Sequence, residues 1–243
     1  MKVSKYRDLS LLEMENRTLV VACDSNGGIG SKEGDIIKVD TYTTARYTLR
    51  VVLMELFAFG AKASLITNCV CGEMYPTASE MIRGLLDEMA LVGIDEEQLT
   101  GSTEENTKTI MTAVGITAIG YIEGRFTKTM LPPNTNVICV GKLKVGNEIK
   151  DCYDKEIVSY EDIRIMRSLG GVHEIVPVGS KGVFYEADNL AKMNDKIFTP
   201  TSSCDVDLYK SAGPATACLA FCDDEAKDEI LKNKKAIFIG NVK

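Results

Sequence analysis

The sequence is poor in the residues that most metal and redox sites require. It contains one histidine, His173, and its eight cysteines form no C-x-x-C pair. A structural zinc site usually draws on close pairs of cysteine or histidine ligands, so the sequence argues against one. Most of the cysteines lie within apolar segments, which is typical of small buried thiols in a reducing compartment. We therefore expect a cytoplasmic protein.

Basic residues and long apolar runs are scarce as well. The chain carries 28 lysines and arginines against 35 aspartates and glutamates, a net charge of −7. Such a balance does not provide the broad basic face that nonspecific nucleic-acid binding requires. No apolar run reaches the roughly 18 residues that a membrane-spanning helix needs, and the N-terminal residues are polar. We expect neither a nucleic acid nor a membrane as partner.

The length and the element pattern predict two α+β domains. A compact protein of 243 residues and 26.6 kDa buries about 70% of its extended surface, enough for one or two cores. The prolines at 132 and 133 block both helix and strand pairing, so we place a domain boundary there, between 1–131 and 132–243. Helices are expected on one face of the sheet in each domain.

Hydrophobic periodicity predicts the individual elements. Strands or strand-like runs are expected at 18–23, 35–40, 63–70, 97–101, 109–121, 136–140, 175–178, 215–221 and 236–239. Helices are expected at 43–59, 76–92, 160–169, 183–193 and 223–233.

A glycine-rich turn follows the strand that ends at Asp24. Successive amide groups in such a turn can bind an anion, a lysine adds positive charge, and a carboxylate at a strand end can hold a divalent metal. The turn is neither a Walker loop nor a Rossmann fingerprint, and an ordinary hairpin is the alternative. The candidate phosphate-binding residues are Gly27, Gly28, Gly30, Ser31 and Lys32.

Two polar residues stand in apolar elements. Glu55 is the only charged residue between Arg50 and Lys62, so it is either buried with a cation or metal, or exposed about 130° from the apolar stripe of its helix. Asn68 lies in an apolar strand, where it either reaches into a site formed by the segment from Thr100 to Asn106 or is exposed at an edge.

The segment from Thr100 to Asn106 gathers hydroxyls and carboxylates directly after a strand. Oxygen ligands of this kind suit Mg²⁺. The alternative is a helix N-terminus, with Ser102 or Thr103 as the cap.

Together, the Asp24 turn, the Leu53–Ala61 segment and the Thr100–Thr103 turn resemble the aminoimidazole ribonucleotide synthetase superfamily. That group includes thiamine-monophosphate kinase, selenophosphate synthetase and the hydrogenase-maturation dehydratase. The resemblance implies a two-domain fold, with a ferredoxin-like, four-stranded N-terminal domain that forms a barrel-like dimer and a mixed α/β C-terminal domain. It also implies ATP and Mg²⁺ as cofactors and a homodimer.

The resemblance also implies roles for particular residues. The Mg²⁺ ligands would be Asp24, Glu55 and Glu105. Besides the turn residues, Asp24, Asn68, Ser102 and Thr103 would contact ATP. Ser102 departs from the family, which has an acidic residue at this place, and Glu104 or Glu105 would compensate.

Residues 100–106 and 177–182 look most similar to the α-ribazole kinases of cobalamin salvage. The resemblance therefore implies a small-molecule kinase that phosphorylates the ribose 5′-hydroxyl of α-ribazole. Thiamine-monophosphate kinase is the alternative, although the aspartate pair of that enzyme is missing. A nucleotide-binding module without catalysis is the second alternative, which Ser102 favours.

Overall fold

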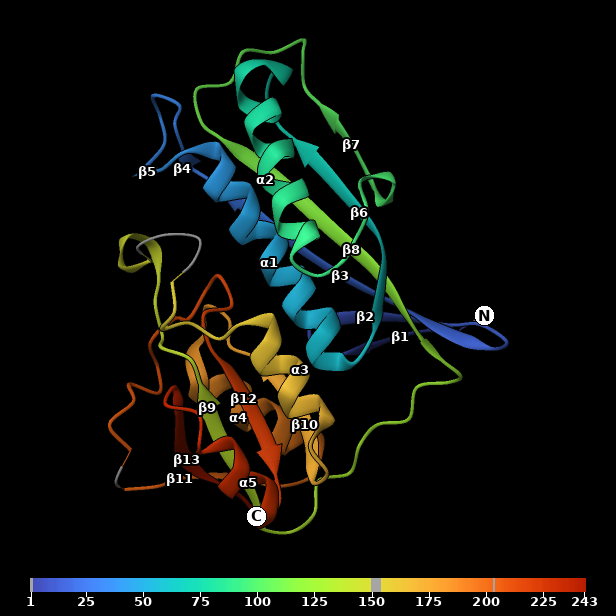
Figure 1. Ribbon diagram of the computed structural model, residues 1–243, viewed down its shortest axis with the longest axis vertical. Helices are drawn as coiled ribbons and strands as arrows, with labels where there is room; N and C mark the ends of the chain where they lie inside the picture. Colours follow the sequence, from blue (N-terminus) through green and yellow to red (C-terminus); the bar gives the residue numbers. More distant parts are fainter. Residues whose placement is uncertain (1, 150–153, 203) are drawn as a thin grey trace. The chain divides into compact units, whose positions relative to one another are not determined.

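The computed structural model describes residues 2–149, 154–202 and 204–243, and Cys152 lies outside them. The chain divides into two compact units (Figure 1). The first contains the chain up to Leu56 together with Ala61–Phe126. The second contains Phe57–Gly60, Thr127–Ile149 and residues 154–243. The domain boundary at residue 131 stays a prediction.

The first unit is built on a six-stranded sheet with the order β1-β2-β3-β8-β6-β7. Its strands are β1 (Lys2–Tyr6), β2 (Leu9–Glu13), β3 (Arg17–Gly27), β6 (Lys62–Val70), β7 (Leu99–Thr103) and β8 (Ala113–Glu123). All neighbouring strands are antiparallel except β6 and β7, which are parallel. Strands β3, β6 and β7 therefore end at the same edge of the sheet, where β8 begins.

Helices α1 (Thr41–Phe59) and α2 (Ser79–Ala90) cover one face of this sheet (Figure 1). Burial alternates along β8, because every second side chain faces the helices. The apolar stripe of α1, including Leu49, Leu53 and Leu56, is fully buried. The predicted helix at 43–59 is thus confirmed and begins two residues earlier.

A buried ion pair joins the two helices. The guanidinium of Arg46 on α1 lies 2.7 Å (Nη2) and 2.9 Å (Nε) from Oε2 of Glu88 on α2. Arg46 is 2% exposed and Glu88 is 4% exposed. A pair so deeply buried requires both partners, because either charge alone would be uncompensated.

The segment between β3 and α1 differs from its prediction. The expected strand at 35–40 is reduced to β5 (Ile37–Lys38), which pairs with β4 (Ile29–Gly30). Asp35 is not part of the strand, because its carboxylate accepts a hydrogen bond from the preceding turn. The predicted helix at 76–92 likewise divides into a π-helical turn, Met74–Ala78, and α2.

The second unit contains a five-stranded sheet with the order β10-β12-β9-β13-β11. Its strands are β9 (Thr135–Val140), β10 (Val172–Pro177), β11 (Phe198–Pro200), β12 (Cys218–Cys222) and β13 (Ala236–Val242), and its helices are α3 (Tyr160–Ser168), α4 (Gly182–Met193) and α5 (Asp224–Ile230). Short 3₁₀ turns lie at Glu96–Gln98 in the first unit and Gly146–Glu148 in the second.

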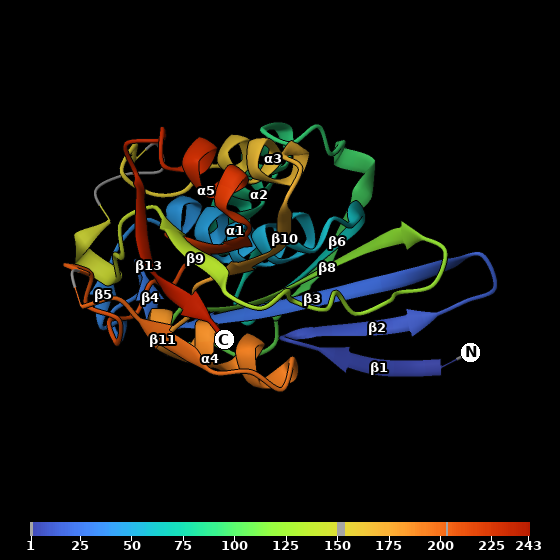
Figure 2. The ribbon, with the colours of Figure 1, turned by 90° about the horizontal axis from the view of Figure 1, so that it is seen from below.

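Every residue of β9 and β12 is buried, so both faces of this second sheet are covered. Helix α4 lies on one face, and α3 and α5 lie on the other (Figure 2). The prediction of helices on a single face is wrong for this unit. A strand that is buried on both sides shows no alternation of apolar and polar residues. The short apolar runs in the sequence therefore did not indicate whether one face of the sheet or both would be covered.

The main sheet of the first unit has six strands instead of the expected four, because the polar N-terminus adds the β1–β2 hairpin. The sheet is open, and no closed barrel is found among the described strands. Within the described residues, no helix combines the length and the apolar character needed to span a membrane.

Candidate functional site

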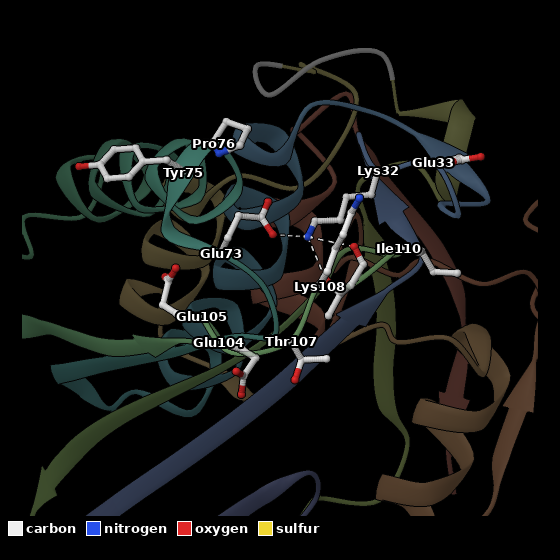
Figure 3. A pocket seen from close by; sticks show the side chains of 11 residues that line it. Lys32, Glu33, Glu73, Tyr75, Pro76, Glu104, Glu105, Thr107, Lys108 and Ile110 are labelled. Atoms are coloured by element: carbon white, nitrogen blue, oxygen red, sulfur yellow. Dashed lines mark hydrogen bonds and ion pairs between the residues drawn. The ribbon is translucent and has the colours of Figure 1, made fainter.

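A pocket of about 550 Å³ opens at the edge of the first unit's sheet where β3, β6 and β7 end (Figure 3). Loops that follow these strands form its walls: residues 28–38 after β3, 71–77 after β6 and 104–112 after β7. The lining residues are Lys32, Glu33, Glu73, Tyr75, Pro76, Glu104, Glu105, Thr107, Lys108, Thr109 and Ile110.

Lys32 connects the three loops. Its Nζ donates to Oε2 of Glu73 at 2.5 Å and to Oγ1 of Thr109 at 2.8 Å, and it lies 3.5 Å from the carbonyl oxygen of Thr109. The second oxygen of Glu73 accepts from the hydroxyl of Thr77. Figure 3 shows Glu73 pointing toward Lys32, whereas Tyr75 points away from it. The centre of the pocket therefore contains a lysine that is already paired.

The Lys32 ammonium, followed by the Thr77 hydroxyl, holds the pKa of Glu73 at about 2, below its ordinary value of 4.5. Ionised Glu73 thus contributes stability that is fully present above pH 4.5 and is lost as the pH falls toward about 2. We expect the difference in unfolding free energy between the wild type and Glu73→Gln to shrink over this interval. Chemical denaturation at several pH values measures it, and a constant difference would contradict the ion pair.

Asp35 fixes the glycine-rich turn. Its carboxylate accepts from the backbone and hydroxyl of Thr112, both at 2.7 Å, and from the amide of Lys32 at 2.8 Å. Burial raises the pKa of Asp35, but these hydrogen bonds outweigh burial and leave the pKa lowered. A Cβ atom at Gly30 would lie only 2.2 Å from Oγ1 of Thr112, so this approach requires glycine.

Two amides of the predicted phosphate cradle are already used. The N–H of Gly28 donates to the carbonyl of Thr112, and the N–H of Lys32 donates to Asp35. Gly27 closes β3 and belongs to its ladder with β8. Ser31 is exposed. The role of the turn in phosphate binding stays a prediction.

Glu105 lies at the pocket wall. Its Oε1 accepts from the amide of Met74 at 2.8 Å and from the hydroxyl of Thr103 at 2.9 Å. The carboxylate of Glu104 accepts from the amide of Asn106, two residues further along, at 2.6 Å. The predicted residues Lys32, Thr103 and Glu105 are thus brought together at one edge of the sheet. Ser102 is exposed and lies opposite Cys69 in the β6–β7 ladder.

Asp24 and Asn68 share a row across the sheet. Both are register partners of Ile116 on β8, so both side chains lie on the helix-covered face. Asn68 is buried and its side chain lies against Gly101. Asp24 is half-buried, and burial raises its pKa, partly offset by a hydrogen bond from the Ser25 backbone.

Glu55 does not join the acidic residues of the pocket. Its carboxylate forms an ion pair with Arg7, from the turn between β1 and β2, at 3.7 Å. Among the described residues, no group of three or more histidine, cysteine or acidic side chains is placed to hold a metal ion. The structure therefore does not bring Asp24, Glu55 and Glu105 together as one ligand set. Of the two alternatives for Glu55, the structure shows a carboxylate paired with a cation, and that cation is an arginine.

Several residues of the site are missing from the sequence-based set. Glu73, Thr109 and Lys108 line the pocket, and Asp35 and Thr112 hold its loop. The sequence did contain a signal for these residues, because charged residues closely follow each apolar strand. Strands that end at the same edge of a sheet bring such residues together.

Comparisons with known proteins bear on the fold. No protein-family model matches the chain, and no curated protein matches it in sequence. Solved structures do match. The PurL protein of Thermotoga maritima complexed with ADP aligns with a TM-score of 0.70 at 14% identity, covering 99% of this chain and 42% of that one.

Two further structures match along most of their length. AaThiL complexed with AMPPCP and TMP aligns with a TM-score of 0.68 at 11% identity, covering 97% of this chain and 84% of that one. A structure of the HypE–HypF complex aligns with a TM-score of 0.65 at 15% identity, covering 97% and 86%.

The fold is AIR synthase-like. The comparison therefore shows that the chain shares the fold of these proteins, and its membership of the superfamily stays a prediction. The chain spans about two fifths of the length of the PurL chains it matches.

Proposed function

We propose that the protein is an ATP- and Mg²⁺-dependent small-molecule kinase whose nucleotide phosphates bind at the strand-end pocket. One observation carries the proposal: a pocket containing two lysines lies at the ends of β3, β6 and β7 in a fold shared with PurL bound to ADP and ThiL bound to AMPPCP. Phosphoryl transfer depends mainly on positioning and charge neutralisation. Because four glutamates line the pocket beside its two lysines, Mg²⁺ would supply most of the positive charge.

Mg²⁺ would be held by few protein ligands. The ion usually keeps several waters and binds one or two carboxylates together with phosphate oxygens. Asp24 fits this role, since a half-buried carboxylate whose pKa is raised by burial is stabilised by a nearby cation. Glu105 would act separately, because it follows β7, three strands away from the strand of Asp24, and the two carboxylates would not reach one ion. It would bind a second ion through the oxygen that does not accept from Met74 and Thr103. When bound, the ion would neutralise phosphate charge.

Glu55 is left out of this ligand set because it pairs with Arg7. We expect Glu55→Gln to lower the unfolding free energy by roughly 1–2 kcal/mol through the weakened pair and to leave the Mg²⁺ dependence of ATP binding unchanged. The matched variant Asp24→Asn should weaken that dependence instead. Calorimetric titration with ATP over a range of Mg²⁺ concentrations separates the two. A shift in the Mg²⁺ requirement of Glu55→Gln would return Glu55 to the site.

For the acceptor we propose the ribosyl 5′-hydroxyl of α-ribazole. The support is the similarity of residues 100–106 and 177–182 to α-ribazole kinases. Thiamine monophosphate is the rival acceptor. The exposed Ser102, at a place that is acidic in the family, favours a third possibility, a nucleotide-binding module without catalysis.

Incubation with ATP, Mg²⁺ and either α-ribazole or thiamine monophosphate separates these functions. ADP formed only with α-ribazole supports the proposal, and ADP formed only with thiamine monophosphate supports the rival kinase. Nucleotide binding without ADP from any acceptor would leave the binding module.

We also propose a cytoplasmic homodimer of two-domain protomers, formed through the face of the first sheet that α1 and α2 leave open. Half-buried apolar side chains lie on this face: Leu19, Val21, Leu65, Ile119 and Tyr121. Partly exposed apolar residues on an open sheet face are typical of an association surface. A molar mass of one chain in solution would contradict the dimer.

A further inference from the structure

The two lysines of the pocket differ in what their ammonium groups can still bind. A lysine ammonium has three donors and no acceptor. For Lys32 these are directed at the carboxylate of Glu73 and at the hydroxyl and carbonyl of Thr109. Its side chain is only 12% exposed. A phosphate would have to displace an ionised carboxylate to reach it.

The surroundings of Lys32 are built around this paired state. Thr109, which accepts from Lys32, donates its own hydroxyl to the carbonyl of Cys71 at 3.3 Å. A Cβ atom at Gly72 would lie 3.0 Å from Nζ of Lys32, so the ammonium fits against a bare backbone. Lys32 therefore joins the walls of the pocket to one another.

Lys108 lines the same pocket and is exposed. Within the described parts of the chain, its ammonium makes no hydrogen bond or ion pair. The pocket's other cation is neutralised by Glu73. An anion can thus reach Lys108 by replacing water, without breaking an internal contact.

We infer that Lys108 binds the anionic group of the pocket's ligand, a phosphate or polyphosphate, and that Lys32 holds the pocket walls in place. This inference rests on the proposed function, since it assigns the phosphate contact of that same site. It replaces the role that the sequence pattern suggested for Lys32. A hydrogen bond between an exposed ammonium and a phosphate is charge-assisted, so its loss should be measurable as affinity.

The test compares Lys108→Met with Lys32→Met, with Lys62→Met as the control. Lys62 is exposed at the start of β6, the end opposite the pocket. Calorimetric titration with inorganic triphosphate, and separately with ATP and Mg²⁺, gives the affinities, and thermal unfolding gives Tm. We expect Lys108→Met to bind triphosphate about 10-fold more weakly at an unchanged Tm, Lys108→Arg to restore binding, and Lys62→Met to match the wild type.

For Lys32→Met we expect a lower Tm and an affinity within about 3-fold of the wild type, measured well below that Tm. Unchanged affinity in Lys108→Met would overturn the inference, as would a larger loss in Lys32→Met at unchanged Tm. If the wild type binds triphosphate through Lys108 but does not bind ATP, the proposed function fails and the inference holds. If it binds neither, both fail.

Discussion

Replacing Arg46 with methionine is expected to lower the unfolding free energy by about 3–5 kcal/mol, the usual cost of removing one partner from a buried ion pair. The substitution would leave the carboxylate of Glu88, which is 4% exposed, without its cation between α1 and α2. Tyr42 would also lose a contact, since its hydroxyl accepts from Nη1 of Arg46 at 3.2 Å. Denaturation by urea measures the loss.

The matched control is Arg83→Met on α2, whose ion pair with Glu80 is exposed, so its loss should lower the unfolding free energy far less. The double variant Arg46→Met/Glu88→Met should recover part of the loss, because two apolar side chains remove the unpaired charge. A single variant as stable as the wild type would show that the pair contributes little to joining the helices.

Replacing Asp35 with alanine is expected to lower the unfolding free energy by roughly 2–4 kcal/mol and to weaken ligand binding in the pocket. The amide and hydroxyl of Thr112, a fully buried residue, would lose their acceptor, and so would the amide of Lys32. The turn that presents Lys32 and Glu33 would then be free to rearrange.

The pH dependence offers a second measurement on Asp35. Because hydrogen bonds lower its pKa below the ordinary 3.8 despite burial, its ionised form stabilises the fold above pH 3.8 and this contribution is lost as the pH falls through the lower folded value. The stability gap between the wild type and Asp35→Asn should therefore narrow at acidic pH.

The regular elements were predictable where burial is one-sided. Helix α1 and strand β8 each present a clear periodic apolar face, and both lie within a few residues of their predicted bounds. Strand β1 gave no such signal, because it is an edge strand whose first two residues, Lys2 and Val3, are both exposed. Edge strands are held by backbone pairing to a neighbour, which side-chain patterns do not record.

The site was predictable only in part. The sequence pattern placed Lys32 in a phosphate-binding turn, and this role stays a prediction. The structure places Lys32 in the pocket at the sheet edge. Its partners were hidden, because Glu73 and Thr109 lie 41 and 77 residues further along the chain. For Glu55, the sequence correctly indicated a carboxylate within an apolar helix. It could not indicate that the carboxylate would form an ion pair with Arg7.

The contacts of Lys32, Asp35 and Thr109 have a dynamic consequence. They tie the loops after β3, β6 and β7 to one another through side chains, so no one loop can swing out without releasing the others. The rim of the cavity should consequently fluctuate as one cooperative unit, and backbone amides in all three loops should exchange their hydrogens for deuterium at related rates.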